Sequence, residues 1–381
     1  MGRFTLRAAV AAVGVGTMAG ALVLSSGPIA GAALAHGATP FLLTLGAPAQ
    51  VASTVPANGD VNPYGIAIVT ASSGHLVRGA TLISNFNSKA NVQGTGTTIV
   101  QVLPSKKVTV FANLAGVAKT HRCPGGVGLS TALGILPGGW VVVGSIGSGP
   151  GGKLPAANPA GCLILVDRNG RVGAVWSGRT LNGPWDMAVT STATSAKLYV
   201  SDVLARAGTK PGPVSKGACE VVRLDVALHG AAVPTLTSTT VIGKAFPWRA
   251  NLSTFVIGPT GIAIGKNGTA YVVQTLGNHV TAIPNAATRT TAVVDGTRTL
   301  TRGGALNSPL GAVMAPNGDL IVVNGGDGFA VEISPSGKQV AKLQLVQNGA
   351  GALFGLAVTP SKTALQFVND STNALDVAVK H

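Results

Sequence analysis

Aromatic side chains close to isolated carboxylates are the residues of this chain whose types and spacing could do chemistry. Tyr64 stands in the segment NPYG, Trp185 and Asp186 stand in GPWD, and Trp248 and Arg249 stand in FPWRANL. Aromatic and arginine side chains are favoured as binding anchors, and carboxylates and amides can contact a ligand or a hard cation. The sequence therefore predicts ligand contact by Tyr64, Trp185, Asp186, Asp202, Trp248, Arg249 and Asn324.

Catalytic motifs and metal-binding motifs are absent from the sequence. It contains no serine nucleophile elbow and no paired carboxylates, and its six histidines lack the spacing of a metal site. His121 and Cys123 are close in the chain but belong to no ligand cluster. We therefore predict no catalytic residue and no metal ligand from local motifs.

A repeated phrase positions the candidate residues. It is a Pro-x-Gly step into a short apolar strand, a turn and a second Val-rich strand, as in Gly258 to Val273 and Ser308 to Asn324. The repeat glycines, or the residues aligned with them, are Gly65, Ala132, Asp186, Gly261, Gly311 and Gly355. The interval between the last repeats is about the length of one four-stranded blade. The sequence therefore predicts an all-β protein, a six-bladed β-propeller.

The two ends of the repeat region predict how the ring closes. The sixth blade has strands near Gly355, Leu365 and Ala374, and the chain then stops at His381 without a fourth strand. An unpaired edge there would invite unwanted pairing, and residues 41–55 have the composition of a strand. We expect this N-terminal strand, within a segment spanning 36–57, to complete the last blade of a propeller spanning 58–381.

The N-terminus and the charge balance predict where the protein works. Arg3 and Arg7 precede an apolar stretch, and Ala33-Leu34-Ala35 is a small-x-small cleavage site, so residues 1–35 are expected to be a signal peptide. The competing interpretation is an uncleaved membrane anchor, although no later segment is long enough to span a bilayer. A net charge of +15 favours anionic polymers as partners, whereas scattered cations without a stacking motif argue against nucleic acid. We expect a monomer that is secreted or held in the cell envelope.

The repeat resembles that of NHL-repeat proteins, which are six-bladed propellers found in exported bacterial proteins and bacterial receptor kinases. The resemblance is carried by the Pro-x-Gly-Ile-Ala step, the Asn-Gly turn and the Tyr-Val-Val strand between Gly258 and Val273, and by their echo between Ser308 and Asn324. It covers residues 58–381. The resemblance implies binding of a protein, a peptide or RNA more often than catalysis.

Propeller topology predicts which residues face the central channel. The first strand of each blade runs along the channel, so the residues before the repeat mark should line its mouth: Tyr64, Thr131, Trp185, Thr260, Leu310 and Phe354. A second, polar ring is expected where the second strands end, at Asn85, Ser145, Asp202, Gln274, Asn324 and Asn369. These short polar side chains could contact a ligand, or they could cap the strand ends.

Loop lengths single out the same face for binding. Residues 85–97, 145–161 and 202–218 form long connections in the first three blades, and long loops on a rigid scaffold often carry binding. The segment FPWRANL adds Trp248 and Arg249 to this face, although Phe246 and Trp248 could instead fill the groove between blades.

The three cysteines, Cys123, Cys162 and Cys219, all map to loops of this face. In an oxidising compartment we expect one disulfide that involves Cys162 and leaves one free thiol. The sequence leaves two pairings open: Cys162 with Cys219, or Cys123 with Cys162.

Two functions are predicted from this arrangement. The first is an exported binding or scaffold protein that recognises a protein, a peptide or an anionic polysaccharide through the long-loop face without a cofactor. The alternative, implied by the resemblance to six-bladed propellers, is a metal-dependent lactonase or esterase that holds Ca²⁺ with Asn, Asp and Glu from several blades. None of the predicted mouth residues is a carboxylate or an amide, so the sequence favours binding over catalysis.

Overall fold

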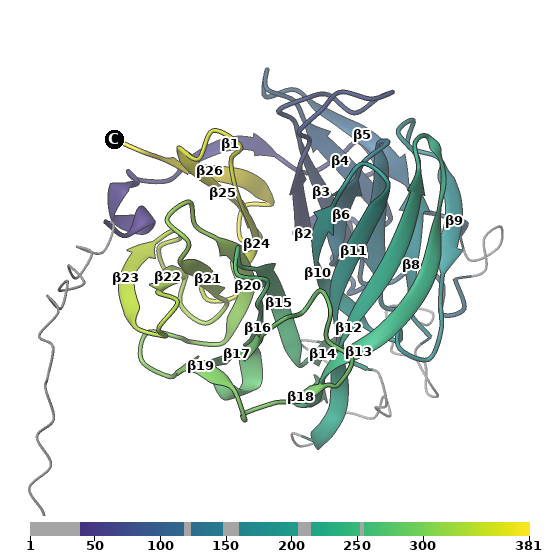
Figure 1. Ribbon diagram of the computed structural model, residues 1–381. Helices are drawn as coiled ribbons and strands as arrows, with labels where there is room; N and C mark the ends of the chain where they lie inside the picture. Colours follow the sequence, from purple (N-terminus) through teal and green to yellow (C-terminus); the bar gives the residue numbers. More distant parts are fainter. Residues whose placement is uncertain (1–38, 118–122, 148–159, 205–214, 252–254) are drawn as a thin grey trace, which may run out of the picture. The chain divides into compact units, whose positions relative to one another are not determined.

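The computed structural model describes residues 39–117, 123–147, 160–204, 215–251 and 255–381. This part of the chain folds into six sheets arranged in a ring, antiparallel except for one short pairing, which confirms the predicted all-β, six-bladed propeller (Figure 1). The predicted signal peptide, residues 1–35, lies outside the described residues. Among the residues that the structure does describe, no helix is long and apolar enough to cross a membrane.

Each sheet forms one blade of the propeller, and its strands are given below in order from the inner strand to the outer strand. The first three blades contain β2 (Val61–Ile68), β3 (Thr81–Asn87), β4 (Thr98–Val102) and β5 (Val108–Asn113); β6 (Leu133–Leu136), β7 (Trp140–Ser145), β8 (Cys162–Val166) and β9 (Val172–Trp176); and β10 (Pro184–Ser191), β11 (Ser195–Asp202), β12 (Ser215–His229) and β13 (Ala232–Asn251). The strands β14 (Phe255–Ile257) and β18 (Val293–Val294) add to β13.

The last three blades follow the same order. They contain β15 (Pro259–Ile264), β16 (Ala270–Gln274), β17 (His279–Ile283) and β19 (Thr299–Arg302); β20 (Pro309–Met314), β21 (Leu320–Asn324), β22 (Phe329–Ile333) and β23 (Gln339–Gln344); and β24 (Leu353–Val358), β25 (Ala364–Asn369), β26 (Ala374–Val379) and β1 (Ala49–Ser53). The inner strands β2, β6, β10, β15, β20 and β24 contact one another in turn, and β24 contacts β2, so the ring around the channel is closed.

The second strand of a blade is buried on both faces, which explains why its sequence is a continuous apolar run. In β16 every residue is buried. Val272 packs into the hydrophobic cluster shared with the third blade, whereas Val273 packs into the cluster shared with the fifth blade. Side chains alternate between the two faces of a strand, so one strand joins a blade to both of its neighbours.

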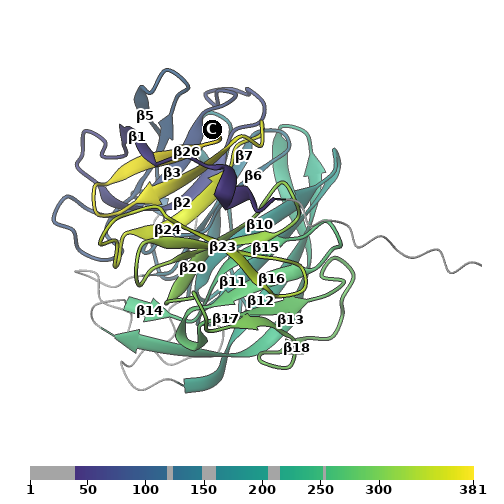
Figure 2. The same ribbon diagram turned by 90° about the vertical axis from the view of Figure 1, so that its left-hand side faces the viewer.

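Closure of the ring uses the N-terminal segment, as predicted. The strand β1 pairs antiparallel with β26, with Ala49 opposite Val377 and Ser53 opposite Ala374 (Figure 2). The predicted strand is shorter than expected, because residues 41–44 form the 3₁₀ turn η1 (Phe41–Thr44). The backbone N–H groups of Phe41 and Leu42 donate to the buried Glu332 carboxylate at 2.8 and 2.7 Å. A carboxylate that accepts two neighbouring N–H groups stabilises a turn at this point. An extended strand here would leave the same N–H groups without a partner.

A disulfide joins Cys123 to Cys162, with 5.6 Å between their Cα atoms. This is the pairing within the second blade, so the other predicted pairing, Cys162 with Cys219, is wrong. Cys219 is a buried free thiol that donates to the Val203 carbonyl. Disulfides are typical of proteins that fold in oxidising compartments.

Candidate functional site

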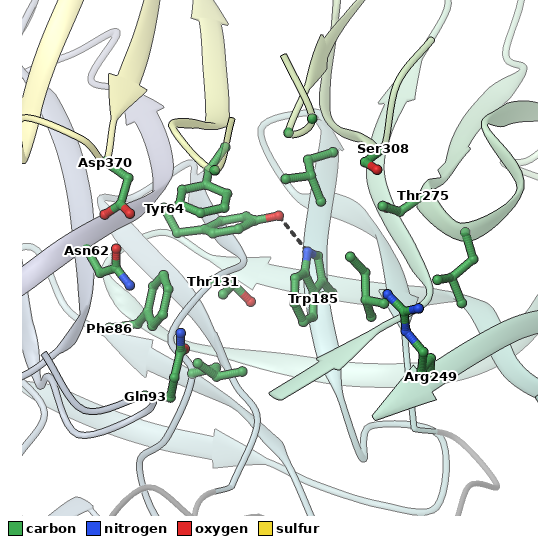
Figure 3. Close-up of a pocket in the computed structure, with 18 of the residues that line it drawn as sticks. Asn62, Tyr64, Phe86, Gln93, Thr131, Trp185, Arg249, Thr275, Ser308 and Asp370 are labelled. Atoms are coloured by element: carbon green, nitrogen blue, oxygen red, sulfur yellow. Dashed lines mark hydrogen bonds between the residues drawn. The ribbon is translucent and has the colours of Figure 1, made fainter. Parts of the chain in front are cut away.

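A pocket of about 600 Å³ lies at the mouth of the central channel (Figure 3). We refer to it as the mouth pocket. Its lining includes five of the six predicted mouth residues: Tyr64, Thr131, Trp185, Leu310 and Phe354. Thr260 is fully buried instead, and its hydroxyl bonds the Thr275 hydroxyl at 2.9 Å.

Three further residues line the mouth pocket. They are Asn62, Leu129 and Ser308, and each stands two positions before a mouth residue. Asn62 and Ser308 both have positive φ, 65° and 47°. Positive φ in residues other than glycine is uncommon, and such strain clusters at functional sites.

Four aromatic rings form the floor of the mouth pocket. The Tyr64 ring stacks on Phe354 at 4.8 Å between centroids and meets Phe86 and Trp185 edge-on at 6.0 and 5.7 Å. Trp185 Nε1 donates to the Tyr64 hydroxyl at 2.5 Å, the bond drawn across the centre of Figure 3. Burial and the nearby Asp186 carboxylate raise the pKa of Tyr64 well above its usual value, so the phenol stays neutral.

The predicted polar ring caps strand ends and does not line the mouth pocket. Asn324 accepts from Asn307 N at 3.0 Å and donates to the Ala305 carbonyl at 2.8 Å. Asp202 accepts from Gly183 N and Leu204 N at 2.9 and 3.1 Å. Burial raises the pKa of Asp202 to about 7.

The residues that reach the pocket stand one position after this ring. They are Phe86, Thr275, Gly325 and Asp370. The side chain next to a capping residue points the opposite way, and this alternation is the signal that could have identified Asp370 from the sequence.

Asp370 is the acidic group of the mouth pocket (Figure 3). With the Asn62 amide oriented so that its nitrogen faces the carboxylate, Asn62 donates to both Asp370 oxygens and accepts from Asn87 Nδ2 at 2.7 Å. Asn373, in the same turn as Asp370, holds the Asn62 backbone by accepting from its N–H at 2.8 Å. Burial raises the pKa of Asp370, whereas the hydrogen bonds from Asn62 favour the charged carboxylate and oppose this rise.

Arg249, on β13, is the cation of the mouth pocket, and in Figure 3 it lies across the aromatic floor from Asp370. Its Nε atom is buried and has no hydrogen-bond partner among the described residues, and the same is true of the Thr131 hydroxyl. Buried polar groups are normally paired, so these two atoms are exceptions in the wall of the pocket. The neighbouring Phe246 and Trp248 are buried in the hydrophobic core. This agrees with the alternative prediction that these two side chains fill the groove between blades.

The remaining predicted site residues lie elsewhere or outside the described part of the chain. Asp186 lines a different cavity, on the other side of the aromatic floor. Residues 148–159 and 205–214, in two of the long loops, lie outside the described residues.

The donors of the mouth pocket do not fit a calcium ion. Calcium takes six to eight oxygen ligands, usually several carboxylates, whereas Asp370 is the sole carboxylate in this lining. The Asn278 side-chain oxygen is engaged by Ser308 N at 2.8 Å. Over the described ranges, no group of three or more His, Cys, Asp or Glu residues could hold a metal.

Comparison with known proteins identifies the fold. No protein-family model and no curated protein matches the chain. Among solved structures, a gluconolactonase from Xanthomonas campestris is similar, with 14% identity and a TM-score of 0.54 over 84% of this chain and 87% of that one. A calcium-binding regucalcin from Agrobacterium tumefaciens is similar over 87% of this chain and 93% of that one, with 14% identity and a TM-score of 0.51. At this identity the likeness shows a shared six-bladed fold, and the resemblance to NHL-repeat proteins is not confirmed.

The comparison overturns the main functional prediction from the sequence. A binding or scaffold propeller was expected, and this prediction is contradicted, because the similar structures include a gluconolactonase. The sequence favoured binding over catalysis because no carboxylate or amide was predicted at the channel mouth. Asn62 and Asp370 both lie there.

Proposed function

We propose that the chain is an enzyme that hydrolyses an ester or lactone bond in a small acidic substrate bound in the mouth pocket. The observation that carries the proposal is the Asp370 carboxylate, which lies in this pocket and is held in place by hydrogen bonds from Asn62. A general base works best when its pKa lies near the working pH. The likeness to a gluconolactonase supports the same class of reaction.

The reaction needs water and the side chains of this pocket. Asp370 takes a proton from water while the water oxygen forms a bond to the substrate's carbonyl carbon. Negative charge then develops on the carbonyl oxygen, where a hydrogen-bond donor of the pocket wall would stabilise it. When the tetrahedral intermediate collapses, the bond from the carbonyl carbon to the alkoxy oxygen breaks, and that oxygen takes the proton from Asp370. The products are an alcohol and a carboxylic acid.

The other groups of the pocket position the substrate. The Arg249 guanidinium, which lines the pocket, suits a carboxylate or another anionic group at the far end of the substrate. The aromatic floor of Tyr64, Phe86, Trp185 and Phe354 supports the apolar part between the two ends. Because the donor set does not fit calcium, no step of this mechanism passes through a metal ion.

A screen of small lactones and aryl esters, including acidic ones, tests the proposal. For any substrate that is turned over, Asp370→Asn should lower kcat by about 10²- to 10⁴-fold, because the amide cannot accept a proton. Asp167→Asn is the matched control, since Asp167 accepts backbone N–H groups in a turn of the second blade outside this pocket. For the wild type, kcat/KM should rise with pH as Asp370 loses its proton and becomes able to act as a base.

Two results would contradict the proposal. One is full activity in Asp370→Asn. The other is activity that a chelator abolishes and Ca²⁺ restores, since that would make the metal the activating group.

The proposed site of action is outside the cytoplasm. The disulfide between Cys123 and Cys162 supports it, as does the predicted signal peptide. Sequencing of the mature N-terminus tests it, and a chain that retains Met1 in the cytoplasmic fraction would refute it.

A further inference from the structure

A second cavity, of about 390 Å³, lies in the same channel on the other side of the aromatic floor. Tyr64 lines both spaces, so its ring is part of the partition between them. The walls of the second cavity are the inner strands, with apolar side chains such as Leu133, Met187, Ile262 and Leu356. Asp186 is the sole residue with a charged side chain in this lining.

Asp186 stands where the repeat has glycine. At the equivalent glycines a Cβ atom would meet a carbonyl oxygen of the next inner strand: at 2.5 Å for Gly65, 2.3 Å for Gly261, and 2.1 Å for Gly311 and Gly355. These contacts explain why glycine recurs in four of the six blades, because a Cβ atom there would come too close to the next strand. The second blade has the small residue Ala132 at this position, and the third blade has Asp186. A carboxylate at this position is a departure from the repeat, and departures from a local rule are expected at functional sites.

The surroundings of Asp186 orient its carboxylate without neutralising it. One oxygen accepts from Met187 N at 2.8 Å, and the other accepts from Ile262 N, on the fourth blade, at 3.2 Å. No lysine, arginine or histidine of the described residues forms an ion pair with Asp186. Asp186 is partly buried where it lines the cavity, and a carboxylate withdrawn from water is normally paired with a cation. Burial raises the pKa of Asp186 to about 7.

We propose that the second cavity binds a small aliphatic ammonium ion, with the ammonium group on Asp186 and the hydrocarbon chain against the apolar walls. The charge of the ligand follows from the single unpaired carboxylate, and its apolar body follows from the inner-strand side chains. An ammonium group can donate to the lone pairs that Met187 N and Ile262 N leave free. The volume lies within the usual range for small-molecule pockets. The inference is independent of the hydrolytic function proposed for the mouth pocket.

Binding of hexylammonium to the full chain, measured by calorimetry at pH 8.5, tests this site. 1-Hexanol is the uncharged probe of similar size. The wild type should bind hexylammonium at least ten times more tightly than 1-hexanol, and Asp186→Asn should bind the two probes equally. Asp186→Gly, which restores the repeat residue, should behave like Asp186→Asn. Asp370→Asn is the matched control and should keep the preference, because Asp370 lies in the other pocket.

Several outcomes would overturn the proposal: no binding of hexylammonium to the wild type, equal binding of both probes, or a preference lost in Asp370→Asn and kept in Asp186→Asn. If the Asp186 variants do not fold, a crystal structure of the wild type with hexylammonium decides the matter. An ammonium group beside Asp186 supports the proposal, and one placed elsewhere refutes it.

Discussion

The two cavities of the channel each contain one carboxylate, and the difference between them lies in what surrounds it. In the mouth pocket Asp370 receives hydrogen bonds from the Asn62 amide and faces Arg249 across the aromatic floor. In the second cavity Asp186 receives two backbone N–H groups and is surrounded by apolar walls. The first arrangement suits proton exchange with a polar substrate, whereas the second suits a lasting pair with a cation. The same residue type thus supports two kinds of chemistry about one aromatic partition.

The partition is built from neighbouring residues of one inner strand. Trp185 and Asp186 are adjacent on β10, and they line the mouth pocket and the second cavity respectively. The pairing of β10 with β11 is irregular between Pro184 and Asp186, so the two cavities meet at a bulge of the strand. Their separation depends on the contact between Trp185 and Tyr64.

The largest effect is expected from Trp185→Ala, which removes half of that contact. Trp185 is 6% exposed, and replacing a buried tryptophan with alanine typically costs about 3–5 kcal/mol of unfolding free energy. Urea unfolding measures this loss. Trp176→Ala is the control, because Trp176 is only partly buried on the outer strand β9 and should cost less.

The same variant shows whether the partition keeps the cavities apart. If it does, hexylammonium bound in the second cavity of Trp185→Ala should interfere with substrate binding in the mouth pocket, raising KM at least several-fold. In the wild type the two should bind independently. Independent binding in Trp185→Ala as well would show that the ring is not what separates the sites.

A smaller effect, in the pH dependence of stability, is expected from Asp186→Asn. The pKa of Asp186 is raised from 3.8 to about 7 by burial, so between these values the folded chain binds a proton that the unfolded chain has released. This contribution to stability is present below about pH 4 and is lost as the pH rises to about 7. A shift of this size corresponds to roughly 2–4 kcal/mol.

The test is urea unfolding of the wild type and Asp186→Asn at pH 5 and pH 8. Asp202, whose pKa is also raised to about 7, contributes equally to both proteins, so the comparison isolates Asp186. The wild type should lose more stability between the two pH values than the variant does. Equal losses would mean that Asp186 is solvated and that the second cavity does not impose the burial described above.

The sequence predicted the ring better than it predicted the site, for a physical reason. The repeat reflects local requirements of the backbone, such as glycine where two inner strands approach closely. The mouth residues Tyr64 and Trp185 were predicted because they belong to that repeat. Asp370 was missed because its role depends on Asn62, which is 308 positions away in the chain and meets it only when the ring closes.

The position of the polar ring shows a second limit. Strand ends were placed correctly at Asp202 and Asn324, yet the residues that reach the mouth pocket stand one position later. Because successive side chains point to opposite faces, a shift by one residue exchanges capping residues for lining residues. Composition alone did not distinguish an amide that caps a strand from a carboxylate that faces a ligand.

The smallest effect is expected from Tyr64→Phe, which keeps the aromatic floor and removes only the hydroxyl that accepts from Trp185 Nε1 at 2.5 Å. The stacking on Phe354 remains, but the buried indole N–H loses its partner, which should cost about 1–2 kcal/mol of unfolding free energy. Tyr271→Phe is the matched control: Tyr271 is also buried, and none of the described residues hydrogen-bonds to its hydroxyl, so its loss should be close to neutral. Urea unfolding compares the two variants. Equal stabilities would show that the Trp185 N–H finds another acceptor and that ring packing, without the hydrogen bond, holds the partition between the cavities.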